Sequence, residues 1–445
     1  MKNRKNINDP EIMGKESIGR LLFRFSMPAI IAMMVQAVYN VVDRAFIGHH
    51  VGLNAYNGIY VAFPIMMGLM AIAILFGVGG SSLFSIRLGE GDRVGAMKLL
   101  GNTTMMLILS SILVTILGLF FAEPLLRLFG ASGDTMPYAL RYIRIIFSGN
   151  IFMMLGMGLN NFLRAEGKAT IAMTTMLIGA ISNMVFDYLL IVVLGWGTAG
   201  AAWGTVFARI LVCSWLFFYY FSGRVAIPFK ASMMKLESKI ISSVMGLGIS
   251  AFFQQISMVI MTAVLNNVLL RLGGDVAISV MATVFSVMVM IYLPTMGIAQ
   301  GAQPIFGFNF GAKKFARLKK SLIISSVVAF SFGIVGFLVV KLFSVQLTQV
   351  FVSSSLPNGA EVISITAKVM PIFLMVLPLT SLQIIGSGYF RSIGKVWHAM
   401  GLGLLRQFIF FIPILFILAS RFGLDGVWYT GPLADILAFV VTRYL

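Results

Sequence analysis

The sequence predicts an all-α integral membrane protein with twelve transmembrane helices in two six-helix lobes related by pseudo-two-fold symmetry. Three observations predict it. First, 59% of the residues are hydrophobic and 11% are charged, whereas soluble domains carry about 25% charged residues. Second, apolar segments of about 20 residues, enough to cross roughly 30 Å of hydrocarbon, recur about twelve times. Third, the second half of the chain repeats the first at a nearly constant offset, which aligns Gly52 with Gly274.

The apolar segments divide the chain into predicted spans with short polar connections. We place the spans at 22–48, 55–82, 100–121, 138–163, 170–194, 199–221, 241–270, 276–301, 320–343, 361–388, 396–419 and 424–442. The segment 1–20 lacks the apolar core and small-residue cleavage site of a signal peptide, so we expect the first span to be retained. Cys213 is the single cysteine, which precludes an internal disulfide.

The internal repeat indicates how the spans are grouped. Sliding the chain against itself by this offset aligns Gly52 with Gly274, Ala55 with Ala277, Phe63 with Phe285, Gly79 with Gly301 and Gly89 with Gly311. We therefore expect an amino-terminal lobe at 1–221, a cytoplasmic linker at 222–239 and a carboxyl-terminal lobe at 240–445. Because six spans return each lobe to the same side, the two copies have parallel topology, and transporters commonly bind substrate between such repeats.

The basic residues alternate between the two sides of the predicted membrane. The formal net charge is +18, and most Lys and Arg lie at the amino end and in the even-numbered connections. The odd-numbered connections hold Arg127, Arg271 and Arg421. The positive-inside rule then places both termini in the cytoplasm of a multi-pass protein of the plasma membrane, the cell inner membrane. The basic loops need only the anionic inner leaflet as a partner, so we do not expect nucleic acid binding.

Two carboxylates lie inside the apolar sequence of the first half, and the corresponding positions of the second half hold Leu265 and Ile414. An ionisable group within a span indicates a functional site by default. At 1.5 Å per residue, Asp43 lies about 7 to 8 Å and Asp187 about 12 Å inward from the outer ends of their spans. Thr205 lies about 9 Å inward by the same rise. We expect all three in the outer half of the membrane.

Neighbouring amides extend these positions into two polar faces. Asn183 precedes Asp187 by one helical turn, and Gln36, Asn40 and Asp43 form an i, i+4, i+7 stripe. Carboxylate, amide and hydroxyl oxygens are hard donors, which suit a proton or a small hard cation such as Na⁺. The alternative is a structural role in which Asp43 pairs with Arg44 or Arg209 to hold helices together.

These residues resemble those of the multidrug and toxic compound extrusion (MATE) family. The resemblance rests on Asn40-Val-Val-Asp43-Arg-Ala-Phe-Ile-Gly48 ahead of Phe63-Pro64, on Asn183-Met-Val-Phe-Asp187 and on Gly200-Ala-Ala-Trp-Gly-Thr205, and it covers nearly the whole chain from about Ile18. It implies an antiporter that exports varied, often cationic, organic compounds in exchange for inward H⁺ or Na⁺. In the branch that this chain resembles, the cation site lies in the amino lobe, matched here by Asp43, Asn183, Asp187 and Thr205.

The carboxyl lobe departs from the acidic pattern of another MATE branch. Its seventh span offers Gln254 and Gln255, and its tenth offers Gln383 and Lys368, with no acid between Glu361 and Arg391. We therefore expect coupling to reside in the amino lobe. Asp435, in the last span, is interpreted as a partner for a base such as Arg406.

Other polar and methionine residues are candidates for a pliable substrate cavity, since methionine repacks around varied ligands. The candidates are Gln36, Asn40, Met33, Met173, Met176, Gln254 and Gln255; lipid-facing packing explains many of the methionines equally well. Pro28 interrupts the first span and permits a helix kink. In the resembled family, a bend of this span is linked to drug release.

Three other functions fit the sequence less well. Gly89-Glu-Gly-Asp92-Arg93-Val-Gly95-Ala-Met-Lys98 resembles the loop motif of major facilitator transporters, but that class leaves the acid, Asn, Asp and Thr set unexplained. A lipid-linked oligosaccharide flippase of the same superfamily would use a basic cavity, for which Arg44, Arg209 and Arg406 are candidates. We do not expect an enzyme, because no catalytic His, Ser or acid grouping is evident. We expect a monomer without a cofactor, acting on small organic molecules in the lipid bilayer.

Overall fold

The computed structural model describes residues 10–442 apart from 52, 130, 132, 134 and 353–357, and the side chains of 10, 40–50, 53–57, 275 and 442 also lie outside the description. The described chain is helical almost throughout. Its elements are η1 (Pro10–Gly14), α1 (Ile18–His50), α2 (Leu53–Glu90), α3 (Arg93–Leu128), α4 (Met136–Ser148), α5 (Asn150–Ala165), α6 (Ala169–Asp187), η2 (Tyr188–Val193), α7 (Gly197–Phe221), η3 (Ala231–Met234), α8 (Ser238–Gly311), α9 (Phe315–Gln349), α10 (Gly359–Phe373), α11 (Leu377–Ser392), α12 (Val396–Leu404), η4 (Leu405–Phe411) and α13 (Ile412–Thr442).

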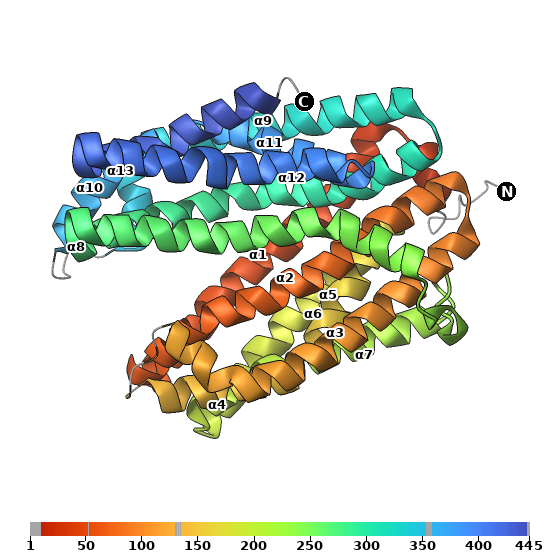
Figure 1. The fold of residues 1–445 in the computed structure, drawn as a ribbon, viewed down its shortest axis with the longest axis horizontal. Helices are drawn as coiled ribbons and strands as arrows, with labels where there is room; N and C mark the ends of the chain where they lie inside the picture. Colours follow the sequence, from red (N-terminus) through yellow and green to blue (C-terminus); the bar gives the residue numbers. More distant parts are fainter. Residues whose placement is uncertain are drawn as a thin grey trace.

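The helices form two bundles, which Figure 1 shows one above the other. The first bundle contains α1 to α7, and the second contains α8 to α13. The bundles meet at the end that carries the segment 222–237 between α7 and α8, which we call the linker end. Toward the opposite end, which we call the far end, their helices diverge (Figure 1).

The apolar lengths agree with a protein that crosses a membrane many times. Within the described residues, nine helices are long and apolar enough to span, or up to eleven if each bent pair is one span. The predicted spans 138–163 and 361–388 are such pairs: α4 and α5 meet at 53°, and α10 and α11 meet at 55°. The first bend falls at Gly149, where a Cβ would lie 2.5 Å from Val206 of α7. Tight packing on α7 therefore accompanies this bend.

Two of the longest helical stretches break where the sequence predicts a connection. Gly274 (φ 60°, ψ −154°) interrupts α8 between predicted spans seven and eight. Gly423 (φ 59°, ψ −138°) interrupts α13 between predicted spans eleven and twelve. A positive φ of this kind is accessible to glycine at little cost, which explains the residue type at both breaks. α1, in contrast, is one helix with Pro28 inside it, so the kink at Pro28 stays a prediction.

Close backbone contacts join the bundles in a seam along α2 and α8. A Cβ at Gly89 would lie 2.1 Å from the carbonyl oxygen of Phe308, and one at Gly311 would lie 2.0 Å from that of Ile86. The offset of the internal repeat converts one contact into the other, as two-fold related bundles require. Gly248 continues the seam, because its Cβ would lie 1.7 Å from the oxygen of Leu75. Only a hydrogen side chain permits such approaches.

Candidate cation site and inter-bundle seam

The candidate cation site is built around the end of α6. Asp187 is its last residue and is fully buried, and Asn183, one turn earlier, is 4% exposed. A π-helical segment, η2, follows Asp187 directly. Such wide turns free backbone groups from the α-helical ladder and are frequent at functional sites. The second bundle has its own π-helical segment at η4, which contains Arg406.

The backbone of α7 approaches the Asp187 carboxylate closely. A Cβ on Gly204 would lie 2.2 Å from Oδ1 of Asp187, so glycine is required where the acid packs against the helix. Thr205 is the next residue, and its hydroxyl donates to the carbonyl oxygen of Ala201 at 3.0 Å. The structure therefore places Asp187 against α7, next in position to Thr205. The joint role of Asn183, Asp187 and Thr205 as a cation site stays a prediction.

The two other candidates on the first span are placed by their backbone. Asp43 and Asn40 lie in α1, which packs along α6, but their side chains lie outside the described residues. Gln36 is partly buried on the same helix. The roles of these three residues stay predictions.

The amide of Asn183 supports a site that binds a small ion. Neither its Oδ1 nor its Nδ2 has a hydrogen-bond partner among the described residues. A buried amide without a hydrogen-bond partner costs about 1–3 kcal/mol. The amide oxygen, one helical turn from a carboxylate, could ligate Na⁺ or accept a hydrogen bond from a protonated group. No cluster of three or more His, Cys, Asp and Glu side chains that could hold a metal occurs in the described part of the chain.

Arg209 lies one turn beyond Thr205 on α7. Its buried guanidinium faces Tyr39 and Tyr142, and its Nη1 has no hydrogen-bond partner within the described ranges. The pairing of this base with Asp43 involves a side chain outside the described residues, so that alternative stays open.

Asp435, a buried acid of the second bundle, is neutralised within that bundle. Oδ1 of Asp435 lies 2.5 Å from Nε of Arg406, and the hydroxyl of Thr380 donates to its Oδ2 at 2.8 Å. The buried hydroxyl of Tyr292 lies beside the Arg406 and Asp435 side chains. The interpretation of Asp435 as a partner of Arg406 is confirmed.

Two predicted cavity residues, Gln255 and Met33, contact the opposite bundle. Gln255 of α8 donates to the sulfur of Met67 of α2 at 3.6 Å, and Gln300 of α8 donates to the sulfur of Met33 of α1 at 3.9 Å. Gln254 instead accepts a hydrogen bond of 2.9 Å from Arg391 within the second bundle.

Met173 and Met176 of α6 are partly buried in the first bundle. The sulfur of Met176 lies 3.8 Å from Nη1 of Arg164. Their assignment to a substrate cavity stays a prediction, because these contacts lie within one bundle.

The sequence reasoning missed a small polar cavity toward the linker end of the seam. Its volume is about 10 Å³, room for about one water molecule. The polar residues that line it are Ser81, Ser85, Asn161, Arg164, Gln300 and Gln303. Gln300 and Gln303 lie one turn apart in an apolar span, and buried amides at that spacing were the signal that could have found it.

Comparison with known proteins agrees with this geometry. A family model described as MatE matches residues 28–189 and 250–417. The multidrug export proteins MepA of Staphylococcus saprophyticus subsp. saprophyticus and of Staphylococcus haemolyticus are each 26% identical to this chain, the first over 95% of this chain and 92% of its own length, the second over 97% and 94%.

Solved structures of the same kind superpose over nearly the whole chain. The MATE multidrug transporter DinF-BH is 38% identical with a TM-score of 0.90, and the match covers 97% of this chain and 96% of that one. A MATE in complex with MaL6 is 24% identical with a TM-score of 0.93, covering 98% and 97%, and shows the same fold. The chain therefore belongs to the MatE family of multidrug and toxic compound extrusion transporters, which are multi-pass membrane proteins and not enzymes.

Proposed function

We propose that this chain is a secondary antiporter that exports varied, often cationic, organic compounds in exchange for inward H⁺ or Na⁺. The observation that carries the proposal is the buried pair of Asn183 and Asp187 against Gly204. Burial raises the free energy of an ionised carboxylate, so uptake of a proton or a cation stabilises the site. Ion binding and release then change the charge of the first bundle, and that change can be coupled to movement. Membership of the MatE family supports the same function.

Transport would proceed by alternating access between two lobes. The lobes are the six-span halves 1–221 and 240–445, which give twelve spans in all, joined by the linker 222–239. The protein would lie in the plasma membrane with both termini and the linker end facing the cytoplasm, because the basic connections lie at the linker end. The close α2 and α8 seam supports a state that is closed at the cytoplasmic side, with the far end turned outward.

The ion site would include Asp43 of α1 together with Asn183, Asp187 and Thr205. The ion would bind when the site faces outward, and substrate and ion would exclude each other through competition or through movement of α1. The second lobe would contribute cavity wall and motion, because its buried acid Asp435 is held by Arg406.

The direct test is efflux of a fluorescent cationic dye from proteoliposomes under separately imposed Na⁺ and H⁺ gradients. We expect dye efflux that responds to at least one of the two gradients. We expect Asp43→Asn to abolish this efflux. A response to neither gradient would overturn the antiporter.

A flippase for anionic lipid-linked substrates is the second candidate, favoured by two guanidinium groups. Arg164 bonds to Asn161, and Arg391 bonds to Gln254 and Ser387, which are neutral partners. Buried cations held this way suit a phosphate group. Translocation of an anionic lipid between leaflets without any ion gradient would favour this function over the antiporter.

A further inference from the structure

The segment 10–17, which we call the amino-terminal strap, lies between the two bundles at the linker end. It comprises η1 and the turn before α1. Met13 is fully buried, in a hydrophobic cluster that draws on both bundles. Gly14 packs so closely on the second bundle that a Cβ would lie 2.9 Å from both Cε1 of Phe308 and Nζ of Lys314. The Lys314 ammonium also donates to the carbonyl oxygen of Gly14 at 3.0 Å. The strap is thus an integral part of the packing.

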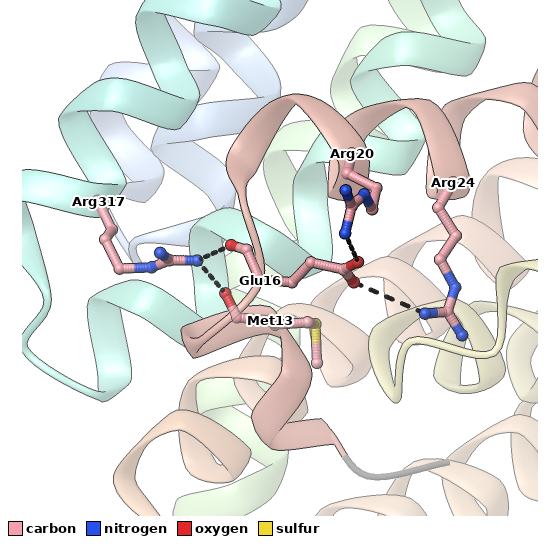
Figure 2. Close-up of polar contacts among 5 residues, drawn as sticks. All are labelled: Met13, Glu16, Arg20, Arg24 and Arg317. Atoms are coloured by element: carbon pink, nitrogen blue, oxygen red, sulfur yellow. Dashed lines mark hydrogen bonds and ion pairs between the residues drawn. The ribbon is translucent and has the colours of Figure 1, made fainter. Parts of the chain in front are cut away.

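The second bundle holds the strap by its backbone carbonyls, as Figure 2 shows for Arg317. The guanidinium of Arg317, near the start of α9, donates to the carbonyl oxygen of Glu16 at 2.5 Å and to that of Met13 at 3.3 Å. The side-chain amide of Asn309, in α8, donates to the same Met13 oxygen at 3.1 Å. Arg317 also donates to Oδ1 of Asn309 at 3.3 Å, which links the two donors. Hydrogen bonds from a charged donor are about twice as strong as neutral ones.

The first bundle holds the same segment from the other side. The Glu16 carboxylate lies 3.4 Å from Nη1 of Arg20 and 3.7 Å from Nη1 of Arg24 (Figure 2), both on α1. Cε of Met13 lies 3.7 Å from the place where a Cβ on Gly167, in the connection between α5 and α6, would be. The strap also continues directly into α1, so it is covalently part of the first bundle.

These contacts determine what happens if the bundles separate at the linker end. The strap must then leave one of them, and its continuity with α1 means that it leaves the second. We propose that the strap is a latch: its carbonyl groups, held by Arg317, stabilise the state closed at the linker end, and their release accompanies each opening. This inference rests on the alternating access proposed above.

The test measures the distance between the bundles at the linker end. Spin labels are placed at Val94, at the start of α3, and at Trp397, at the start of α12, which are 53% and 78% exposed, in a Cys213→Ala background. Arg317→Gln is compared with Lys319→Gln, at an exposed base two residues later on the same helix. A second variant lacks residues 2–17 and so removes the strap carbonyls of Met13, Gly14 and Glu16 that the second bundle holds.

The expected result is a ratio of wide to narrow distances that rises about tenfold in Arg317→Gln, the size expected for loss of the short charge-assisted hydrogen bond to Glu16, because Asn309 still holds the Met13 carbonyl. The deletion variant should show a shift in the same direction, and Lys319→Gln should match the wild type. The wild type should change between narrow and wide distances when a substrate or an ion gradient is applied. If it does so while Arg317→Gln or the deletion keeps the wild-type ratio, the latch is overturned. A wild type that never reaches the wide distance overturns alternating access, and the latch with it.

Discussion

Replacing Gly248 by alanine should open the seam between the bundles. The new Cβ would lie 1.7 Å from the carbonyl oxygen of Leu75, whereas ordinary contacts of this kind begin at 3.4 Å. Because the obstacle is backbone on α2, no side-chain rotation relieves it, and α2 and α8 must separate by roughly 1.5 Å at this level. Overpacking of this kind costs about 1–3 kcal/mol.

Gly246, two residues earlier on the same helix, provides the matched control. A Cβ there meets nothing within 4 Å. Both substitutions gain about 1 kcal/mol of helix propensity, so comparing them isolates the contact with α2. We expect Gly248→Ala to disfavour the state closed at the linker end by about 2 kcal/mol relative to Gly246→Ala, which is about a thirtyfold change in the ratio of states.

The assay is the distance measurement between labels at Val94 and Trp397, made on both variants in the same lipid. Gly248→Ala should populate the wide distance and Gly246→Ala should not. Equal distance distributions in the two variants would refute the claim that backbone contact between α2 and α8 sets the closure.

Two further predictions concern buried charges. Burial raises the pKa of Glu166 to about 7, although the backbone amides of Ala226 and Ile227 donate to its carboxylate. The folded state therefore retains a proton that the unfolded chain loses near pH 4.5. The free energy of unfolding should then fall by on the order of 3 kcal/mol as the pH rises from about 4.5 to 7. Glu166→Gln should flatten that profile and Glu361→Gln, at an exposed carboxylate, should not; a decline that persists in Glu166→Gln would assign it to another group. Arg406→Met should lower the free energy of unfolding by about 3 kcal/mol, because it leaves Asp435 buried without its partner. Arg421→Met, at an exposed base, should have little effect. Thermal unfolding measures both variants, and equal losses of stability would contradict a structural ion pair.

The spans and the repeat could be read from the sequence because their signals are local. Apolar length marks a span, and Gly89 and Gly311 repeat at a fixed offset because both meet the opposite bundle. The bend at Gly149 could not be read in the same way, since it accompanies packing on Val206 of a later helix. The predicted proximity of the helices bearing Asp43 and Asp187 agrees with the packing of α1 along α6.

The candidate site was predictable in its residue types and not in its fit. Helical spacing alone puts Asn183 and Asp187 on one face. The need for glycine at 204 depends on how α6 lies against α7, which no local pattern reveals. The strap was missed for a related reason. Arg317 binds the carbonyl groups of Met13 and Glu16, which lie 304 and 301 residues earlier in the sequence, and any residue type presents such carbonyls.

Coupling of ion uptake to export by the carboxylates of the first lobe is the central proposal. The most direct measurement is gradient-driven efflux of a cationic dye from proteoliposomes that contain Asp187→Asn, compared with Asp425→Asn, at an exposed acid of the second lobe. We predict that Asp187→Asn still binds dye but loses the response to the ion gradient, while Asp425→Asn keeps it. A full gradient response in a folded Asp187→Asn variant would contradict coupling through this site.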